Sequence, residues 1–128
     1  MLHLDLAHAR ESTPRARREV HEFVLSVWPH AATQSPLDDL LDDLRLVVSE
    51  LVTNAVQHGA PPVTLDVTAD LVQGRHRVTV TCHDCGPWDG SSPSPYGGRG
   101  LSLVRSVSTT VDIHGGLTST TVIAALER

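Results

Sequence analysis

The sequence contains no lysine, because all 10 of its basic residues are arginine. This absence excludes a P-loop nucleotide site, in which a lysine binds the β- and γ-phosphates, and it excludes Schiff-base chemistry at a lysine. The basic residues are outnumbered by 15 acidic ones, which gives a formal net charge of −5. That balance argues against nucleic acid or an anionic membrane surface as the main partner.

Long apolar runs are also absent. No run approaches the roughly 18 residues that a transmembrane helix needs, and the opening segment MLHLDLAHAR is too polar for a signal peptide. We therefore expect a cytoplasmic protein that does not enter a membrane. A length of 128 residues predicts one domain, spanning residues 1–128.

Cysteine is scarce, and the two present, Cys82 and Cys85, form a CxxC pattern. Such a pattern occurs in redox pairs and as half of a zinc site. No second ligand cluster follows at a zinc-finger spacing, and Gly86-Pro87 follows where a redox motif would open a helix. A cytoplasmic chain also disfavours a structural disulfide. We interpret both cysteines as residues of a strand-to-loop junction.

Hydrophobic periodicity predicts three helices and about five strands. Thr13-Pro14 and Ser35-Pro36 are expected to start two helices, the second ending at His58 before Gly59. The expected elements are strand 2–6, helix 14–28, helix 36–58, strands near 63–67 and 78–82 joined at Gln73-Gly74, helix 101–107, and strands 110–114 and 118–126. This order predicts an α/β (α+β) two-layer sandwich, with a mixed, mostly antiparallel sheet covered on one face by the helices.

Polar residues recur along one side of the second predicted helix. Glu50, Asn54 and His58 follow at intervals of four residues, beside a stripe of apolar positions, and Asp43 falls on the same side. A row of this kind is often just the boundary between core and solvent. It becomes informative only together with the features that follow it in the chain.

Two of these features lie downstream. The predicted strand RVTVTCHD ends at Asp84, with Gly86 two residues on, and GGRGLSLV then places glycines directly before a helix. Free N–H groups at such a helix start suit a phosphate. Between them lies GPWDGSSPSPYGG, residues 86–98, whose composition predicts a mobile loop of the kind that serves as a lid.

Together, ELVTNAVQHG, HDCG and GGRGL resemble the N, G1 and G2 boxes of the GHKL (Bergerat-fold) ATPase superfamily, which includes gyrase and histidine kinases. The phrase VVSELVTNAVQHG is most similar to the anti-sigma-factor serine/threonine kinases and to small stand-alone ATP-binding proteins of actinomycetes. The resemblance covers nearly the whole chain and implies a Bergerat fold that binds ATP and Mg²⁺.

The resemblance also implies roles for individual residues. Glu50 would be the catalytic base, and Asn54 would bind Mg²⁺ through its side-chain oxygen. His58 would lie near the phosphates, Asp84 would accept a hydrogen bond from the adenine amino group, and Gly86 would leave room for the ring. The phosphates would be covered by Gly98, Arg99, Gly100 and Leu101, with Arg99 the cation for the γ-phosphate.

Three features depart from the family pattern. Trp88 stands where the G1 box has its second glycine, and its ring is expected either to stack on the adenine or to block it. The segment between Gly86 and Gly97 is short for a lid. The last hairpin, LTSTTVIAAL, lacks the usual glycine before its threonine, so we expect Thr118 or Thr120 to act in its place.

The resemblance implies a kinase that binds an RNA polymerase sigma factor and phosphorylates a small anti-anti-sigma protein, with homodimer formation near the first strand and helix. The alternative is a non-catalytic module that sequesters a partner and binds nucleotide weakly or not at all. We do not expect the catalytic domain of a sensor histidine kinase that acts on its own histidine, because we expect no room for a helical hairpin with a phospho-accepting histidine. Action on another chain would need a separate hypothesis.

Overall fold

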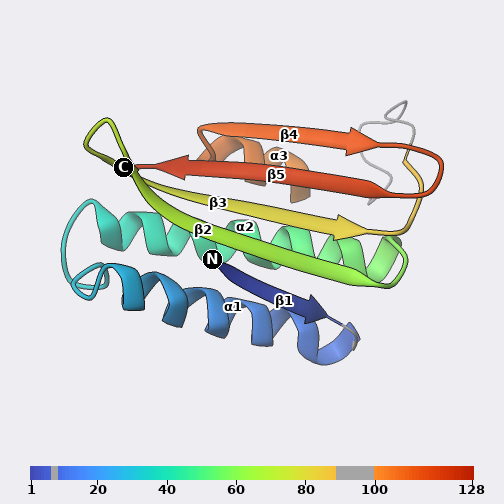
Figure 1. The fold of residues 1–128 in the computed structure, drawn as a ribbon, viewed down its shortest axis with the longest axis horizontal. Helices are drawn as coiled ribbons and strands as arrows, with labels where there is room; N and C mark the ends of the chain where they lie inside the picture. The colour runs from blue at the N-terminus through green and yellow to red at the C-terminus, as the bar shows by residue number, and fades with distance from the viewer. Residues whose placement is uncertain (7–8, 89–99) are drawn as a thin grey trace.

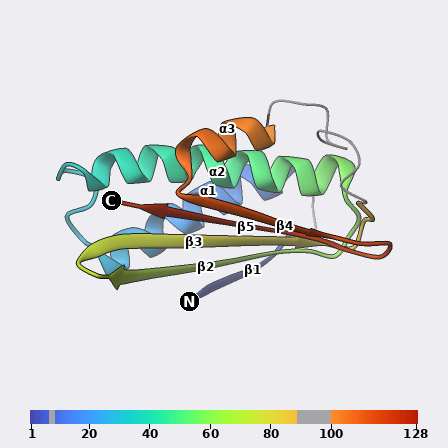
Figure 2. The same ribbon diagram turned by 90° about the horizontal axis from the view of Figure 1, so that it is seen from above.

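The computed structural model describes residues 1–6, 9–88 and 100–128. Its elements follow the order β1 (Leu2–Leu6), α1 (Ala9–Val27), α2 (Leu37–His58), β2 (Val63–Val72), β3 (Arg75–Asp84), α3 (Gly100–Val107), β4 (Thr110–Gly115) and β5 (Thr120–Glu127). The strands form one sheet in the order β1-β2-β3-β5-β4. The three helices cover one face of that sheet, as Figures 1 and 2 show. The predicted two-layer α/β sandwich is confirmed.

The sheet is antiparallel in all of its described pairings, where we expected a mixed, mostly antiparallel one. The reason lies in the position of β5, which pairs with β3 on one side and with β4 on the other. β3 and β4 run in the same direction, but β5 separates them. A parallel pairing therefore never forms.

Helix α2 occupies the centre of the helical layer and contacts both α1 and α3 (Figure 2). Its apolar stripe meets the inward residues of the sheet, which alternate with outward ones as strand geometry requires. Members of this core that are no more than 2% exposed include Leu40, Leu44, Val47, Val48, Leu51, Leu65, Val67, Val80 and Leu126. The hydrophobic pattern of α2 thus fixes which side of the helix faces the sheet.

Both predicted helix starts differ from the structure. Helix α1 already begins at Ala9, so Pro14 lies inside it, and the Thr13 hydroxyl contacts the Thr53 hydroxyl of α2 at 3.0 Å. Helix α2 begins at Leu37 after Pro36, and no side chain caps it. The Thr13 hydroxyl, which the local sequence predicts to cap the start of a helix, contacts α2 instead.

The turn between β2 and β3 lies where the sequence predicts it. Gln73 and Gly74 have φ angles of 52° and 78°. Two consecutive residues with positive φ are typical of a two-residue hairpin turn, and glycine adopts such angles without steric cost. This turn starts the long β2–β3 hairpin, whose far end, at Asp84, carries part of the site described below.

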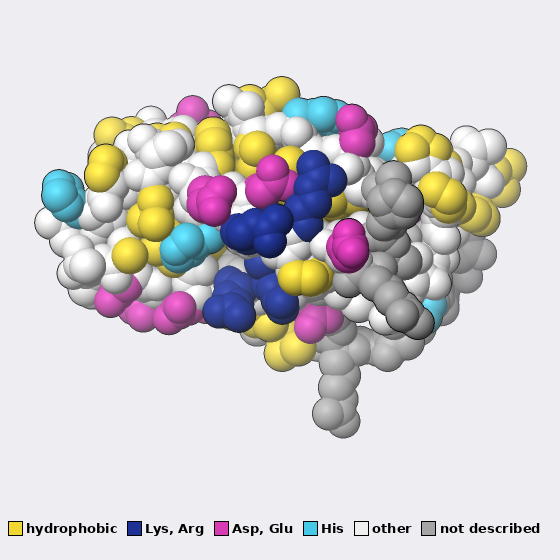
Figure 3. Space-filling view, turned by 90° about the horizontal axis from the view of Figure 1, so that it is seen from below, with side chains coloured by type: hydrophobic (Ala, Val, Ile, Leu, Met, Phe, Trp, Pro, Cys, Tyr) yellow, Lys and Arg dark blue, Asp and Glu magenta, His cyan; other side chains and the backbone are white. Residues whose placement is uncertain are grey.

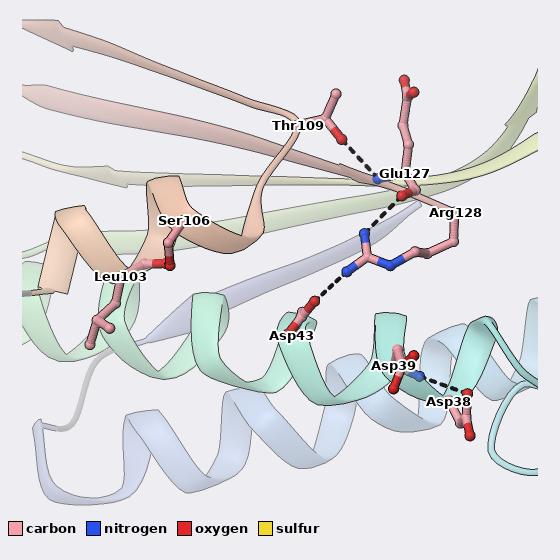
Figure 4. Close-up of polar contacts among 8 residues, drawn as sticks. All are labelled: Asp38, Asp39, Asp43, Leu103, Ser106, Thr109, Glu127 and Arg128. Atoms are coloured by element: carbon pink, nitrogen blue, oxygen red, sulfur yellow. Dashed lines mark hydrogen bonds and ion pairs between the residues drawn. The ribbon is translucent and has the colours of Figure 1, made fainter.

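The last residues of the chain bind back to the sheet and to α2. Arg128 and His76 exchange two backbone hydrogen bonds of 2.8 and 2.9 Å, and the Arg128 guanidinium pairs with the Asp43 carboxylate (Figure 4). Asp43, which we expected on the same side of the helix as Glu50, is engaged in this contact. None of the described helices has the length and apolar character needed to cross a bilayer.

Candidate functional site

The polar row of α2 extends along the last two turns of the helix. Glu50 and Asn54 are half-buried, whereas His58 is exposed as the last residue of the helix. Within the described part of the chain, no hydrogen bond or ion pair engages the Glu50 carboxylate. Asn54 turns inward, where its Nδ2 atom is buried and lacks a hydrogen-bond partner among the described residues.

A small hollow of about 10 Å³ lies where Asn54 turns inward. It is enclosed by α2, α3 and the strands β3 and β5, through the residues Leu51, Asn54, Ala55, Cys82, Asp84, Leu101 and Val122. Its volume corresponds to about one water molecule. The structure thus brings Asn54, Asp84 and Leu101, which lie far apart in the sequence, to one place.

Asp84 is the polar group most firmly held in this hollow. Its side chain is 3% exposed. Its Oδ1 atom accepts hydrogen bonds from the Gly86 amide at 2.7 Å and the Ala60 amide at 3.3 Å. Backbone amides that point at a carboxylate offset the cost of burying it and fix its orientation. Asp84 can therefore serve as an acceptor of defined direction.

Two glycines make room for this carboxylate. A Cβ atom on Gly59 would lie 2.4 Å from Asp84 Cγ, and one on Gly86 would lie 2.9 Å from Asp84 Oδ1. Both distances are too short for real carbon contacts. Gly59 has an ordinary negative φ of −82°, so steric room, not backbone conformation, explains the glycine.

Sequence reasoning assigned Gly59 only to the end of α2. Its place in the site went unnoticed, because the contact joins residues 25 positions apart through the antiparallel sheet. The one available signal was the phrase HG at the end of the N box. Cys85 adds a second link between the same segments, since its amide donates to the Ala60 carbonyl at 2.8 Å.

Thr120 holds the other side of the Gly86 turn. Its side chain is 1% exposed, its hydroxyl donates to the Gly86 carbonyl at 2.8 Å, and it pairs opposite Asp84 in the sheet. Thr118, the other candidate for the missing family glycine, is exposed in the β4–β5 turn. Of the two threonines, only Thr120 contacts the Asp84–Gly86 turn.

Trp88 does not line the hollow formed by the described residues. Its amide donates to the Gly116 carbonyl at 2.9 Å, and a Cβ atom on Gly115 would lie 2.3 Å from the Trp88 carbonyl oxygen and 3.1 Å from Cε3 of the ring. The ring Nε1 is buried without a hydrogen-bond partner in the described part of the chain. Trp88 is thus packed on the β4–β5 hairpin.

The predicted phosphate-binding residues are only partly described. Gly100 is the first residue of α3, and Leu101, 5% exposed, lies in the hollow. Gly98 and Arg99 lie outside the described residues.

The two cysteines differ in environment. Cys82 lies in the wall of the hollow, where burial and the nearby Asp84 carboxylate raise the pKa of its thiol to about 12. A thiol with so high a pKa is a poor nucleophile and a poor metal ligand at neutral pH. No group of three or more potential ligands that could hold a metal occurs among the residues in the described ranges. Cys82 lies in β3 and Cys85 directly follows Asp84, the last residue of that strand, so both cysteines stand at a strand-to-loop junction.

Comparison with known proteins places this geometry in a family. The histidine kinase-like ATPase domain family matches residues 8–126. No curated protein matches the sequence.

Several solved structures are similar in fold. The histidine kinase domain of the Erythrobacter litoralis EL346 blue-light activated histidine kinase aligns with a TM-score of 0.52 and 20% identity over 87% of this chain and 64% of that one. A second structure of that kinase gives 0.49 and 24% identity over 71% and 31%. Acinetobacter baumannii histidine kinase AdeS gives 0.49 and 13% identity over 98% and 67%. This chain therefore spans less than two thirds of both Erythrobacter structures.

The family match covers nearly the whole chain, and it includes every described residue of the hollow. The chain belongs to the histidine kinase-like ATPase domain family, within the GHKL superfamily.

Proposed function

We propose that this chain is a Mg-ATP-dependent protein serine/threonine kinase of the anti-sigma type. It would phosphorylate a small anti-anti-sigma protein and bind an RNA polymerase sigma factor. The observation that carries the proposal is the Glu50/Asn54 pair, one helical turn apart on α2, with Asn54 and Asp84 both lining the hollow. The phrase VVSELVTNAVQHG supports the narrower class.

The polar groups around the hollow suit a nucleotide and its metal ion, although the hollow must widen to admit a purine. Asn54 offers a side-chain oxygen, the ligand type that Mg²⁺ prefers, and a buried N–H that lacks a partner among the described residues. Asp84 offers a fixed carboxylate for an exocyclic amine, and Gly59 and Gly86 let the backbone approach that carboxylate closely. When bound, Mg²⁺ neutralises phosphate charge during transfer.

Glu50 would act on the phospho-acceptor. Its carboxylate would accept the proton of the attacking serine hydroxyl while the serine oxygen bonds to the γ-phosphorus and the bond to the β-phosphate oxygen breaks, leaving ADP. A carboxylate with no ion pair in the described structure is available for this task. His58 would lie one further turn along, towards the phosphates or the lid.

Phosphate transfer to a panel of purified anti-anti-sigma proteins, with ATP labelled at the γ position, tests the proposal. The product should be acid-stable, as phosphoserine is, and Glu50→Gln should slow transfer by at least about 100-fold. Glu11→Gln, an exposed glutamate on α1, is the control. An acid-labile label, typical of phosphohistidine, or full activity of Glu50→Gln contradicts it.

A second candidate is a partner-sequestering module without catalysis. It is favoured by the size of the hollow, since about 10 Å³ does not admit a purine unless its walls move. Calorimetric titration of Mg-ATP into the wild-type protein and into Asp84→Asn and Asn54→Ala separates the two. Binding that weakens in both variants supports the kinase, and no binding at millimolar ATP supports sequestration.

A homodimer is part of the first proposal. Strand β1 is an edge of the described sheet and pairs only with β2, so its outer backbone groups are available to another strand. Light scattering on the protein as it elutes from a sizing column, for the wild type and for His3→Pro in β1, tests whether this edge joins two copies.

A further inference from the structure

A larger hollow lies on the other side of α2, between this helix and α1. Its volume is about 350 Å³, and it shares no residue with the hollow around Asp84. Its floor is apolar and consists of Val20 of α1 and Leu41, Leu44 and Val48 of α2. We call it the α1–α2 groove.

The rim of this groove is basic in an acidic protein. Arg17, Arg18 and Arg45 line it together with a single carboxylate, that of Glu22, whereas the whole chain carries a net charge of −5. Figure 3 shows the α1 side of the molecule, where arginine side chains gather in the middle of the face, with apolar and acidic side chains around them. The local charge is therefore opposite in sign to that of the chain.

The arginines of the rim are largely unpaired. Within the described residues, Arg18 and Arg45 make no side-chain hydrogen bond or ion pair, and Arg17 reaches only the Ser49 hydroxyl at 3.4 Å. Three arginines outside the rim do pair with carboxylates, by the contacts Arg15–Glu19, Arg77–Glu127 and Arg128–Asp43. The rim thus retains free guanidinium groups, which bind carboxylates in a two-pronged geometry.

We propose that the α1–α2 groove is the docking site for an acidic, amphipathic segment of a partner protein. An apolar side chain of that segment enters the groove, and carboxylates beside it pair with Arg18 and Arg45. Aliphatic stems of the arginines extend the apolar contact, as they do at many interfaces. A nucleic acid fits less well, because its phosphates gain nothing from the apolar floor, whereas an apolar side chain of a protein segment does. The docking does not depend on the proposed kinase activity.

Selection of helical peptides of about 16 residues from a randomised displayed library, on the wild-type protein, tests this proposal. The enriched peptides should carry glutamate or aspartate beside apolar residues spaced three and four apart. Their affinity, measured by fluorescence anisotropy, should fall at least about tenfold for Arg18→Glu/Arg45→Glu.

The matched control is Arg75→Glu/Arg105→Glu, which changes the charge equally at two exposed arginines outside the groove. This control should bind the peptides with less than about a threefold change, and thermal melting should show both double variants folded. Asp84→Asn should also keep peptide binding, so that failure of the groove is distinguished from failure of the nucleotide site.

Three results would overturn the proposal. The first is a selection that enriches no acidic peptides. The second is equal loss of affinity in the groove variant and its control. The third is a labelled single-stranded oligonucleotide that binds the wild type, loses binding only in the groove variant and displaces the peptides, which would make the rim a nucleic-acid site.

Discussion

Helix α2 separates two hollows that differ in both size and chemistry. The hollow towards the sheet is about 10 Å³ and is lined by a carboxylate whose oxygen is held by two backbone amides. The groove towards α1 is about 350 Å³, and two of its rim arginines, Arg18 and Arg45, are exposed and have no side-chain partner among the described residues. The polar groups of the α1–α2 groove are therefore held less firmly than the Asp84 carboxylate in the small hollow.

This contrast indicates two kinds of task. Phosphoryl transfer depends on groups held at fixed positions, because catalysis comes mainly from orientation and preorganised charge. Docking through rim charges tolerates mobile side chains, since their main effects are on encounter and specificity. The volume of a cavity is thus a poor guide to where chemistry takes place in this protein. The predictions below test the contrast, from the largest expected effect to the smallest.

Asp84→Ala should have the largest effect, because it removes the carboxylate around which the small hollow is organised. The Gly86 and Ala60 amides would lose their acceptor, at a cost of roughly 3 kcal/mol in the free energy of unfolding, and ATP binding should disappear. Urea denaturation and calorimetric titration measure the two effects. Asp70→Ala, on the exposed end of β2, is the control. If Asp84→Ala bound ATP as tightly as the wild type, the assignment of nucleotide chemistry to the small hollow would be wrong.

Gly59→Ala should destabilise the fold less than Asp84→Ala does, and its effect should be confined to the same small hollow. Because its Cβ atom would lie 2.4 Å from Asp84 Cγ, Gly59→Ala should lower the free energy of unfolding by about 2 kcal/mol and weaken ATP binding. Gly116→Ala is the matched control, since its nearest neighbour would be 3.9 Å away. Similar denaturation midpoints for the two variants would remove the steric explanation for Gly59.

The environment of Cys82 should be visible in its reactivity. With a pKa near 12 and a buried side chain, this thiol should resist alkylation in the native protein, so iodoacetamide should modify at most one cysteine per chain. Both should react in urea. Mass spectrometry after labelling counts the modified sites, and modification of Cys82 at the rate of Cys85 would indicate that the hollow opens readily.

The smallest effect is expected on the open face of the sheet, away from both hollows. The neighbouring Asp66 carboxylate, with help from Asp5, raises the pKa of His3 above its ordinary 6.5. The folded protein therefore holds this proton more tightly than the unfolded chain does. The resulting stabilisation is complete below pH 6.5 and is lost as the pH rises through the folded-state pKa.

Melting temperatures at several pH values test this assignment. The advantage of the wild type over His3→Gln should be greater near pH 6 than near pH 8, whereas His114→Gln, exposed on β4, serves as the control. An advantage that grows with pH would mean that the sign of the linkage is wrong.

The sequence predicted the fold well because its strongest patterns are local. The apolar stripe of α2 and the positive-φ turn at Gln73-Gly74 depend on neighbours within a few residues. The predicted start of α1 was wrong, because the Thr13 hydroxyl contacts Thr53, 40 positions away, instead of capping a helix. Pro14 then marks an early helical turn and not the first one.

The candidate site was recognised from the N, G1 and G2 motifs. The contacts inside the site could not be predicted from those motifs. The role of Gly59 depends on the sheet bringing Asp84 against it, and the placement of Trp88 depends on Gly115 and Gly116. The α1–α2 groove had no sequence signal, since its floor residues read as ordinary core positions. Contacts between distant elements create these features, and periodicity does not encode them.

The packing of Trp88 on the β4–β5 hairpin also gives the protein an internal optical probe. The chain has only two tryptophans, and the other, Trp28, lies edge-on to the His76 ring with the ring centroids 4.8 Å apart. The two indoles therefore sit in different surroundings, next to opposite ends of β3. In Trp28→Phe, a single fluorophore would report the environment of the turn that follows Asp84. Its emission would change whenever that turn and the hairpin separate.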